Sequence, residues 1–391
     1  MTYDQAFFDA GIDRRDTNSV KWAARGVMQQ GMIPLWVADM DFACAQPIRE
    51  ALRVRAEHAC YGYTFEAPED ALAVAGFWKR RHRTVFRPED TLMLPTVVAG
   101  LRACVNTMTQ PGDGVIIQTP VYGPFTASVR ESGRVVLDAE LIRDSSGHYR
   151  MDFEAIERFL KKGARLMILC NPHNPVARAW DGEELRALVM LLKRYRARLV
   201  SDEIHADFVY TPKKFVSVLS LREADEKTLS LVSASKTFNI AGLHQATAVC
   251  READTLALLR KYLERAGAQS GNIFALAATR AAYTSCDDWL DGLLAYLKGN
   301  QEALRELLGE LLPHAVISPM ESTYLTWVDI RAYDTPQCEI GSRCKKHGVA
   351  LSDGQFFGHS AGEGFMRVNY GCPRSQLLEG VQRFAHAVKE G

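Results

Sequence analysis

Residues 229–244 read LSLVSASKTFNIAGLH and contain a single lysine, Lys236, shortly after a run of apolar residues. The run at 229–232 has the length and composition of a buried strand. A lysine on the surface needs no such neighbourhood, whereas a reactive amine has to be held at the end of a rigid element. Lys236 is therefore the first candidate for a functional residue.

Short apolar runs alternate with helical patterns through the middle of the chain. The predicted strands are 115–118, 135–137, 166–170, 199–201 and 229–232, and the predicted helices include 71–81 and 183–195. Strands that alternate with helices favour a largely parallel sheet, and ligands of such sheets bind at the carboxyl ends of the strands.

The pattern changes after about residue 288. A long helix at 288–311, strands at 324–329, 349–352 and 365–368, and a closing helix from Ser375 predict a smaller α+β domain. We expect a large domain from 46 to 288, and a small domain that joins residues 1–45 to residues 289–391.

Composition narrows the class of protein. The 391 residues include 47 basic and 47 acidic side chains, so no general attraction to nucleic acid or an anionic membrane is expected. The nine cysteines are scattered, without the spacing of a zinc site, and are typical of reduced thiols. The chain shows neither a secretory leader nor a membrane-spanning run. We expect a cytoplasmic protein that binds a small molecule and no metal.

Four polar side chains follow predicted strands. Tyr122 comes after 115–118, Asn174 after 166–170, Asp202 after 199–201 and Lys236 after 229–232. Because parallel strands end at the same edge of a sheet, these four side chains are expected to converge on one site.

This set of residues suits pyridoxal phosphate, whose aldehyde condenses with a lysine amine and whose ring then accepts electrons. The ring works best when its pyridine nitrogen is protonated, and Asp202 would supply the negative charge beside it. Two unit charges ~4 Å apart at an effective dielectric near 20 attract by roughly 4 kcal/mol, which corresponds to about three pKa units.

The other polar groups have separate roles in this interpretation. Tyr122 would stack on the ring, and Asn174 would donate a hydrogen bond to the ring oxygen. Ser233 and Ser235 would bind the phosphate.

Seven motifs carry a resemblance to a known family. NPHNPVAR, SDEIHADF and SASKTFNIAGL, in this order, resemble the fold-type I pyridoxal-phosphate enzymes of the aspartate aminotransferase superfamily. With LWVADMDF, YGYT, VYGPF and RVNYGCPRS, they resemble its cystathionine β-lyase branch, the MalY/PatB-type C–S lyases. The resemblance runs from about residue 30 to 385. It implies a mostly parallel seven-stranded sheet sandwiched by helices, plus a smaller α+β domain.

The resemblance also implies roles for particular residues. Lys236 would hold the cofactor covalently, and Arg367 would bind the substrate α-carboxylate with the two-pronged geometry of a guanidinium. Val97 and Val98 would offer backbone amides to the phosphate. Tyr63 would reach the phosphate of a neighbouring subunit, so a homodimer is expected.

Several positions depart from the family pattern. Ala177 and Ser322 stand where glycine is usual, and Thr96 stands where a glycine commonly opens the phosphate loop. His244, eight residues after the lysine, occupies the place of a phosphate-binding arginine of aminotransferases. Asp39 either faces the substrate entrance or caps a loop.

The function implied by the resemblance is α,β-elimination on cystathionine or another S-substituted L-cysteine, giving a thiol, pyruvate and ammonia. Lys236 would also act as general base, and Tyr122 or Tyr63 would protonate the leaving sulfur. An aminotransferase and a regulatory protein that retains the cofactor remain as alternatives.

Overall fold

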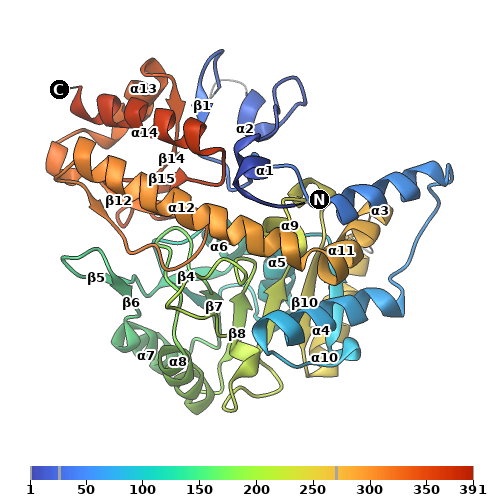
Figure 1. Ribbon diagram of the computed structural model, residues 1–391. Coiled ribbons are helices and arrows are strands. Elements are labelled where there is room, and N and C mark those ends of the chain that lie inside the picture. Colours follow the sequence, from blue (N-terminus) through green and yellow to red (C-terminus); the bar gives the residue numbers. More distant parts are fainter. Residues whose placement is uncertain (1, 25–27, 269–271, 391) are drawn as a thin grey trace.

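A seven-stranded sheet forms the centre of the molecule (Figure 1). The computed structural model describes residues 2–24, 28–268 and 272–390. In sheet order the strands are β2 (Thr91–Leu94), β10 (Ala246–Cys250), β9 (Leu229–Val232), β8 (Arg198–Asp202), β7 (Leu166–Cys170), β3 (Gly114–Ile117) and β4 (Val135–Asp138). Only β10 runs antiparallel to its neighbours in this sheet. The predicted parallel sheet is confirmed, and β2 and β10 are additional strands that the sequence patterns did not indicate.

Both faces of this sheet are covered by helices. Ile168 of β7 packs in one apolar cluster with Leu101 of α5 (Val97–Met108), whereas the next residue, Leu169, packs in the other cluster with Leu188 of α8 (Gly182–Arg194). Successive side chains of a strand point to opposite faces, so a strand buried on both faces is apolar throughout. This is why β7, which reads LMILC, appears in the sequence as an unbroken apolar run. The predicted helix at 183–195 is α8.

A four-stranded antiparallel sheet lies in the C-terminal part of the chain. Its order is β11 (Val316–Ile317), β12 (Leu325–Asp329), β15 (Phe365–Asn369) and β14 (Ser352–Asp353). The accompanying helices are α12 (Asp287–Leu311), α13 (Gln337–Lys346) and α14 (Arg374–Lys389). The predicted long helix, closing helix and strands of this region are therefore confirmed.

The N-terminal residues lie beside the C-terminal part of the chain. Strand β1 (Ile33–Pro34) pairs in parallel with β13 (Val349–Ala350), and α1 (Gln5–Asp9) contacts α12. This pairing supports the grouping of residues 1–45 with 289–391. The boundaries at 46 and 288 stay a prediction.

Three helices pack together at the other end of the molecule. Helix α11 (Ile273–Ser285) lies against α3 (Gln46–Glu57) and α4 (Pro68–His82), the last of which was predicted at 71–81. The remaining elements are α2 (Val20–Ala23), α6 (Pro124–Arg130), α7 (Phe153–Lys161), α9 (Ala234–Thr237), α10 (Ala253–Arg265), β5 (Ile142–Arg143), β6 (Tyr149–Arg150) and 3-10 turns at 88–90, 218–220, 241–243, 331–333 and 354–357.

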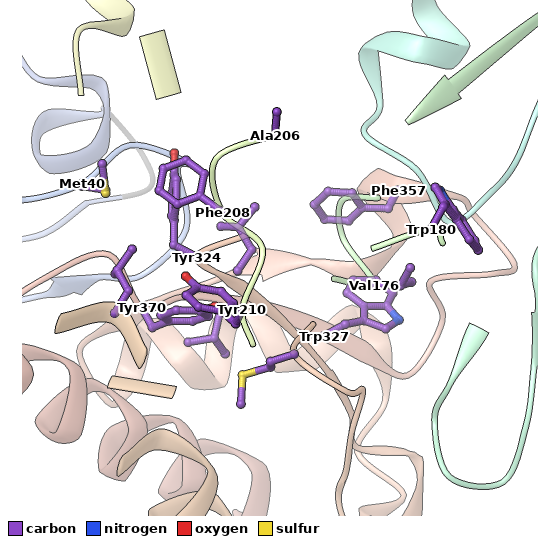
Figure 2. Close-up of a cluster of buried hydrophobic side chains, with 14 of the residues drawn as sticks. Met40, Val176, Trp180, Ala206, Phe208, Tyr210, Tyr324, Trp327, Phe357 and Tyr370 are labelled. Atoms are coloured by element: carbon purple, nitrogen blue, oxygen red, sulfur yellow. The ribbon is translucent and has the colours of Figure 1, made fainter. Parts of the chain in front are cut away.

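An apolar cluster rich in aromatic side chains joins the two sheets (Figure 2). The Phe208 and Tyr324 rings meet edge to face with centroids 4.8 Å apart, and the Thr323 amide donates to the Phe208 carbonyl at 2.7 Å. Phe208 follows β8 in the chain and Tyr324 precedes β12. The cluster therefore fixes the C-terminal sheet against the edge of the large sheet where β8 ends.

Two further findings concern membrane-spanning helices and the cysteines. Within the described ranges, no helix is long and apolar enough to span a lipid bilayer. All nine cysteines are unpaired, and six of them are buried.

Candidate active site

A cavity of about 580 Å³ opens at the carboxyl ends of the parallel strands. It is lined by most of the predicted site residues: Val97, Val98, Tyr122, Asn174, Asp202, Ser235, Lys236, His244 and Arg367. The expected convergence of the residues that follow the strands is therefore present. Trp36, Val37 and Ala38 of the N-terminal segment complete one wall.

Local structure places the lysine. Strand β9 ends at Val232, and Ser233 then caps α9, because its Oγ accepts a hydrogen bond from the Ser235 amide at 3.0 Å. Lys236 lies in this short helix. Its amine donates a hydrogen bond to the Ala38 carbonyl at 2.6 Å.

Burial changes the acidity of this amine. It lowers the pKa of Lys236 to about 8; the positive charge of Arg367 acts in the same direction, while Asp39 and Asp202 oppose it. A neutral amine is both a nucleophile and a base, so Lys236 is suited to react near neutral pH.

Asp202 ends β8 and is buried in the cavity wall. Burial raises its pKa to about 7, although the Ile204 amide donates to Oδ1 at 3.1 Å. Within the described residues this carboxylate makes no ion pair. A buried carboxylate is costly unless a cation lies beside it, so the position fits a ligand that brings its own positive charge, such as a protonated pyridine nitrogen.

Arg367 of β15 presents its guanidinium from the other sheet. It donates to the Trp36 carbonyl at 2.6 Å, to Ser352 Oγ at 3.0 Å and to Asn174 Oδ1 at 3.1 Å, and it lies over the Phe357 ring at 4.7 Å. Burial lowers its pKa to about 10. Among the described residues it has no carboxylate partner, and its Nε has no hydrogen-bond partner at all. The position therefore fits the carboxylate of a bound molecule.

Asn174 is oriented by the same contact. Its Oδ1 accepts from Arg367, which leaves the amide nitrogen as its donor toward the cavity. Its main-chain carbonyl accepts from the Tyr122 amide at 3.2 Å. These contacts agree with the predicted donation to a ring oxygen.

The N-terminus of α5 forms a further part of the cavity lining. Thr96 Oγ1 accepts from the Ala99 amide at 3.0 Å and so caps the helix, while Val97 and Val98 begin it. First-turn amides have no partner inside a helix and attract anions. The residues fit a phosphate group here, with Ser235 and His244 nearby in the lining.

Ser233 occupies a different position from the predicted one. Its hydroxyl donates to the Gln245 carbonyl at 2.6 Å while accepting from the Ser235 amide, and it is absent from the described residues that line the cavity. The structure therefore gives this side chain the role of a helix cap, and it offers no support for a phosphate contact.

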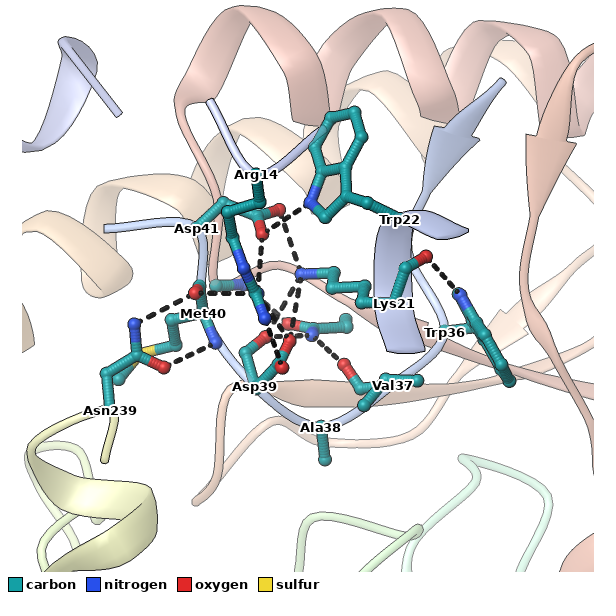
Figure 3. Close-up of polar contacts among 12 residues, drawn as sticks. Arg14, Lys21, Trp22, Trp36, Val37, Ala38, Asp39, Met40, Asp41 and Asn239 are labelled. Carbon is teal, nitrogen blue, oxygen red and sulfur yellow. Dashed lines mark hydrogen bonds and ion pairs between the residues drawn. The ribbon is translucent and has the colours of Figure 1, made fainter. Parts of the chain in front are cut away.

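The carboxylate of Asp39 faces the N-terminal segment (Figure 3). Arg14 donates to both of its oxygens, at 2.9 and 2.8 Å, and Lys21 lies 3.8 Å away. Asp39 is not among the described residues that line the cavity. Of the two sequence interpretations, the loop-anchoring one matches this geometry, and a direct substrate contact has no support.

A short loop that contains Asp39 holds the two basic side chains of the cavity, Lys236 and Arg367. The Trp36 carbonyl accepts from Arg367, and the Ala38 carbonyl accepts from Lys236 and from the Tyr324 hydroxyl at 2.9 Å. The loop belongs to the LWVADMDF motif, but its contacts could not be predicted from the sequence because they use main-chain carbonyls, which every residue has. Tyr324 and Ser352 were missed for the related reason that no pattern places them near the site.

The family assignment rests on comparison with known proteins. A family model described as aminotransferase class I and II matches residues 32–384. The chain belongs to this family. It is 38% identical to cystathionine beta-lyase PatB of Bacillus subtilis, with 97% of this chain and 99% of that protein covered, and 30% identical to protein MalY of Escherichia coli, with 98% of each covered.

Two solved structures that contain pyridoxal phosphate agree closely with this one. Cystalysin from Treponema denticola, which contains pyridoxal 5'-phosphate, superposes with a TM-score of 0.94 at 29% identity and full coverage of both chains. A pyridoxal-phosphate-bound C–S lyase from Staphylococcus hominis gives 0.90 at 31% identity, with 98% of each chain covered. The fold-type I architecture predicted from the motifs is thus confirmed.

Ala177, which stands where the family usually has glycine, has a strained backbone conformation. Ala177 adopts a φ of 58°, in the left-handed region where glycine is favoured and an alanine Cβ is strained. Ser322 is buried, and its Oγ has no hydrogen-bond partner in the described part of the chain.

The two tyrosines predicted to protonate the leaving sulfur, Tyr122 and Tyr63, differ in position. Tyr122 lines the cavity, and burial raises the pKa of its phenol, which keeps the hydroxyl protonated. Tyr63 lies on the segment between α3 and α4, where Tyr61 and Phe65 are exposed as well, and its own side chain is fully exposed. Its contact with a neighbouring subunit stays a prediction.

Proposed function

We propose that this protein is a pyridoxal-phosphate-dependent C–S β-lyase. It converts cystathionine or another S-substituted L-cysteine, with water, into a thiol, pyruvate and ammonium. The observation that carries the proposal is the cavity itself, where the buried amine of Lys236, the unpaired carboxylate of Asp202 and the unpaired guanidinium of Arg367 meet. The relatives named cystathionine beta-lyase support the choice of reaction.

The residues present fit the cofactor. Lys236 would bind it covalently, Asp202 would neutralise its ring nitrogen, and the amides at Val97 and Val98 would hold its phosphate. When bound, pyridoxal phosphate supplies a ring that stores the electron pair released at the substrate Cα.

The side chains of this chain perform the remaining work. Arg367 orients the substrate through its α-carboxylate, which directs the Cα hydrogen toward Lys236. Lys236 removes that proton as a neutral amine, which its pKa of about 8 allows near neutral pH. The bond from Cβ to sulfur then breaks, and the sulfur takes a proton as the thiol leaves.

Either tyrosine could supply this last proton. Tyr122 stands in the cavity as a neutral phenol, and Tyr63 would have to come from a second subunit. We propose a homodimer on the basis of the exposed segment at 61–65, which carries three aromatic side chains on the surface. Sedimentation equilibrium tests the dimer, and a monomer at micromolar concentration would contradict it.

The decisive experiment mixes the purified holoenzyme with cystathionine and no keto acid. We expect pyruvate, followed with lactate dehydrogenase and NADH, and an equal amount of thiol, followed with a disulfide reagent. Lys236→Ala should abolish both products. Transfer of the amino group that depends on an added keto acid, without pyruvate, would establish an aminotransferase instead, which the family description favours as the second candidate.

A further inference from the structure

Phe356 is an exposed aromatic residue at the edge of the active-site cavity. It lies in the 3-10 turn at 354–357, and 55% of its surface is accessible. Its side chain lines the catalytic cavity and also a second cavity of about 830 Å³ on the other side. It is the one described residue common to the two linings, so it stands as the wall between them.

The second cavity lies between α6 and the turn that carries Phe356. Thr126 and Ala127 of α6 form one side, Asp138 at the end of β4 and Glu140 form another, and residues 355–361 close it. Neither the comparisons nor the proposed reaction assigns it a ligand. Its position next to Tyr122, across Phe356, makes it an extension of the catalytic cavity.

Close packing holds the turn in place. A Cβ atom at Gly123 would lie 2.9 Å from the Phe356 carbonyl and 3.0 Å from the ring, so the ring rests directly on a glycine. Gly354 and Gly362 approach so closely that a Cβ on either would overlap the other's main chain. The backbone of the turn is therefore fixed.

The neighbouring residue fixes the turn to the substrate site. The Val121 amide donates to the Phe357 carbonyl at 2.8 Å, and the Phe357 ring lies under the guanidinium of Arg367. Within the described ranges, the Phe356 side chain is held only by ring contacts: it rests on Gly123 and meets the Phe357 ring edge to face with centroids 5.1 Å apart. It meets the Tyr122 ring edge to face with centroids 6.1 Å apart, and more than half of its surface is free. Its side chain can change rotamer while the Arg367 platform stays in place.

We infer that Phe356 is a specificity-determining residue, and that the second cavity receives the S-substituent of cysteine conjugates that extend past the catalytic cavity. The inference rests on the proposed function. The catalytic cavity has to hold the cofactor and the cysteinyl part of the substrate, with the carboxylate on Arg367. A long substituent at sulfur then has to extend beyond the catalytic cavity. Among the described residues, the Phe356 ring alone separates it from the second cavity.

The experiment compares kcat/KM for S-benzyl-L-cysteine and S-methyl-L-cysteine, both uncharged at the substituent because charged side chains of both signs, Arg130 and the carboxylates, line the second cavity. Phe356→Ala removes the wall and should raise the benzyl-to-methyl ratio on the order of tenfold. Ala127→Phe fills the second cavity from α6 and should lower the ratio by a similar factor. Phe356→Tyr and Ala127→Ser, which preserve wall and space, should keep the wild-type ratio.

A binding measurement separates recognition from turnover. The probe is 3-(benzylthio)propionate, which has the carboxylate and the S-substituent but lacks the amine needed for reaction. By calorimetry its Kd should fall several-fold in Phe356→Ala and rise in Ala127→Phe. Because the two variants act from different elements, misfolding of one leaves the other as the test.

The outcomes separate the two proposals. A wild-type holoenzyme that gives no pyruvate from S-methyl-L-cysteine or from cystathionine refutes the proposed function. A wild type that turns over S-methyl-L-cysteine, together with an unchanged ratio and an unchanged Kd in the variants that fold, overturns the role of Phe356 and of the second cavity.

Discussion

Replacing Lys21 by methionine removes one of the two cations that neutralise the buried carboxylate of Asp41. Lys21 Nζ lies 2.9 Å from Asp41 Oδ2 and donates to the Asp39 carbonyl at 3.0 Å, and both Lys21 and Asp41 are buried (Figure 3). Removal of one partner from a buried ion pair costs about 3–5 kcal/mol. Because Arg14 stays 3.0 Å from Asp41, we expect the lower end of this range, about 3 kcal/mol.

Urea unfolding followed by tryptophan fluorescence measures this loss as a shift in midpoint at constant slope. Burial acts to raise the pKa of Asp41, but the charge of Lys21 and a hydrogen bond from Trp22 outweigh it and hold the pKa below its usual range. The stability contributed by a carboxylate with a lowered pKa is fully present above the pKa of the unfolded state, ~3.9, and is lost as the pH falls through the pKa of the folded state. The difference between wild type and Lys21→Met should therefore shrink below about pH 4.

A control removes the cation from an ion pair on the surface. Arg15 lies 2.6 Å from Asp13, with both side chains mostly exposed, and Arg15→Met should change the midpoint little. The reasoning is refuted if Lys21→Met is no less stable than Arg15→Met. It is equally refuted if the loss caused by Lys21→Met is the same at pH 3 as at pH 7.

Three further predictions follow from the site. Arg367→Lys keeps the charge but loses the planar fork, so kcat/KM for lyase turnover should fall roughly 10–100-fold, mostly through KM; an unchanged KM would contradict the carboxylate contact. In the protein stripped of cofactor, carbamoylation of Lys236 by cyanate, measured by peptide mass spectrometry, should rise with pH with a midpoint near the pKa of about 8, well below the 10.5 of an ordinary lysine. Ala177→Gly should stabilise the protein by about 0.5–1 kcal/mol in urea because the φ of 58° suits glycine, whereas Ala179→Gly, a nearby buried alanine without this strain, should destabilise it.

The parallel core of the fold could be predicted because its strands are buried on both faces. The run at 166–170 is apolar at every position and the run at 229–232 is interrupted only by Ser230, and this pattern marks both in the sequence. Strand β10 reads ATAVC, in which two alanines weaken the strand preference of Thr247 and Val249. Strand β10 also reverses direction, which an alternation of strands and helices does not indicate.

The site could be predicted where a side chain follows directly on a strand. Asp202 and Lys236 are fixed by the strand ends that precede them, and the structure places both in the cavity. Ser233 and Asp39 were less predictable because a hydroxyl or carboxylate next to a site can bind a ligand or a local partner equally well. For Asp39 the partner, Arg14, lies 25 positions away, and no pattern in a single sequence joins the two.

The contacts at Trp36 and Ala38 affect how this protein can change. Arg367 and Lys236 are held by main-chain oxygens, which every amino acid at positions 36 and 38 would supply. The side chains of Trp36, Val37 and Ala38 meanwhile line the cavity. Mutation can therefore reshape this wall one codon at a time while Lys236 and Arg367 keep their anchors, so that new substrate ranges are accessible without first losing catalysis.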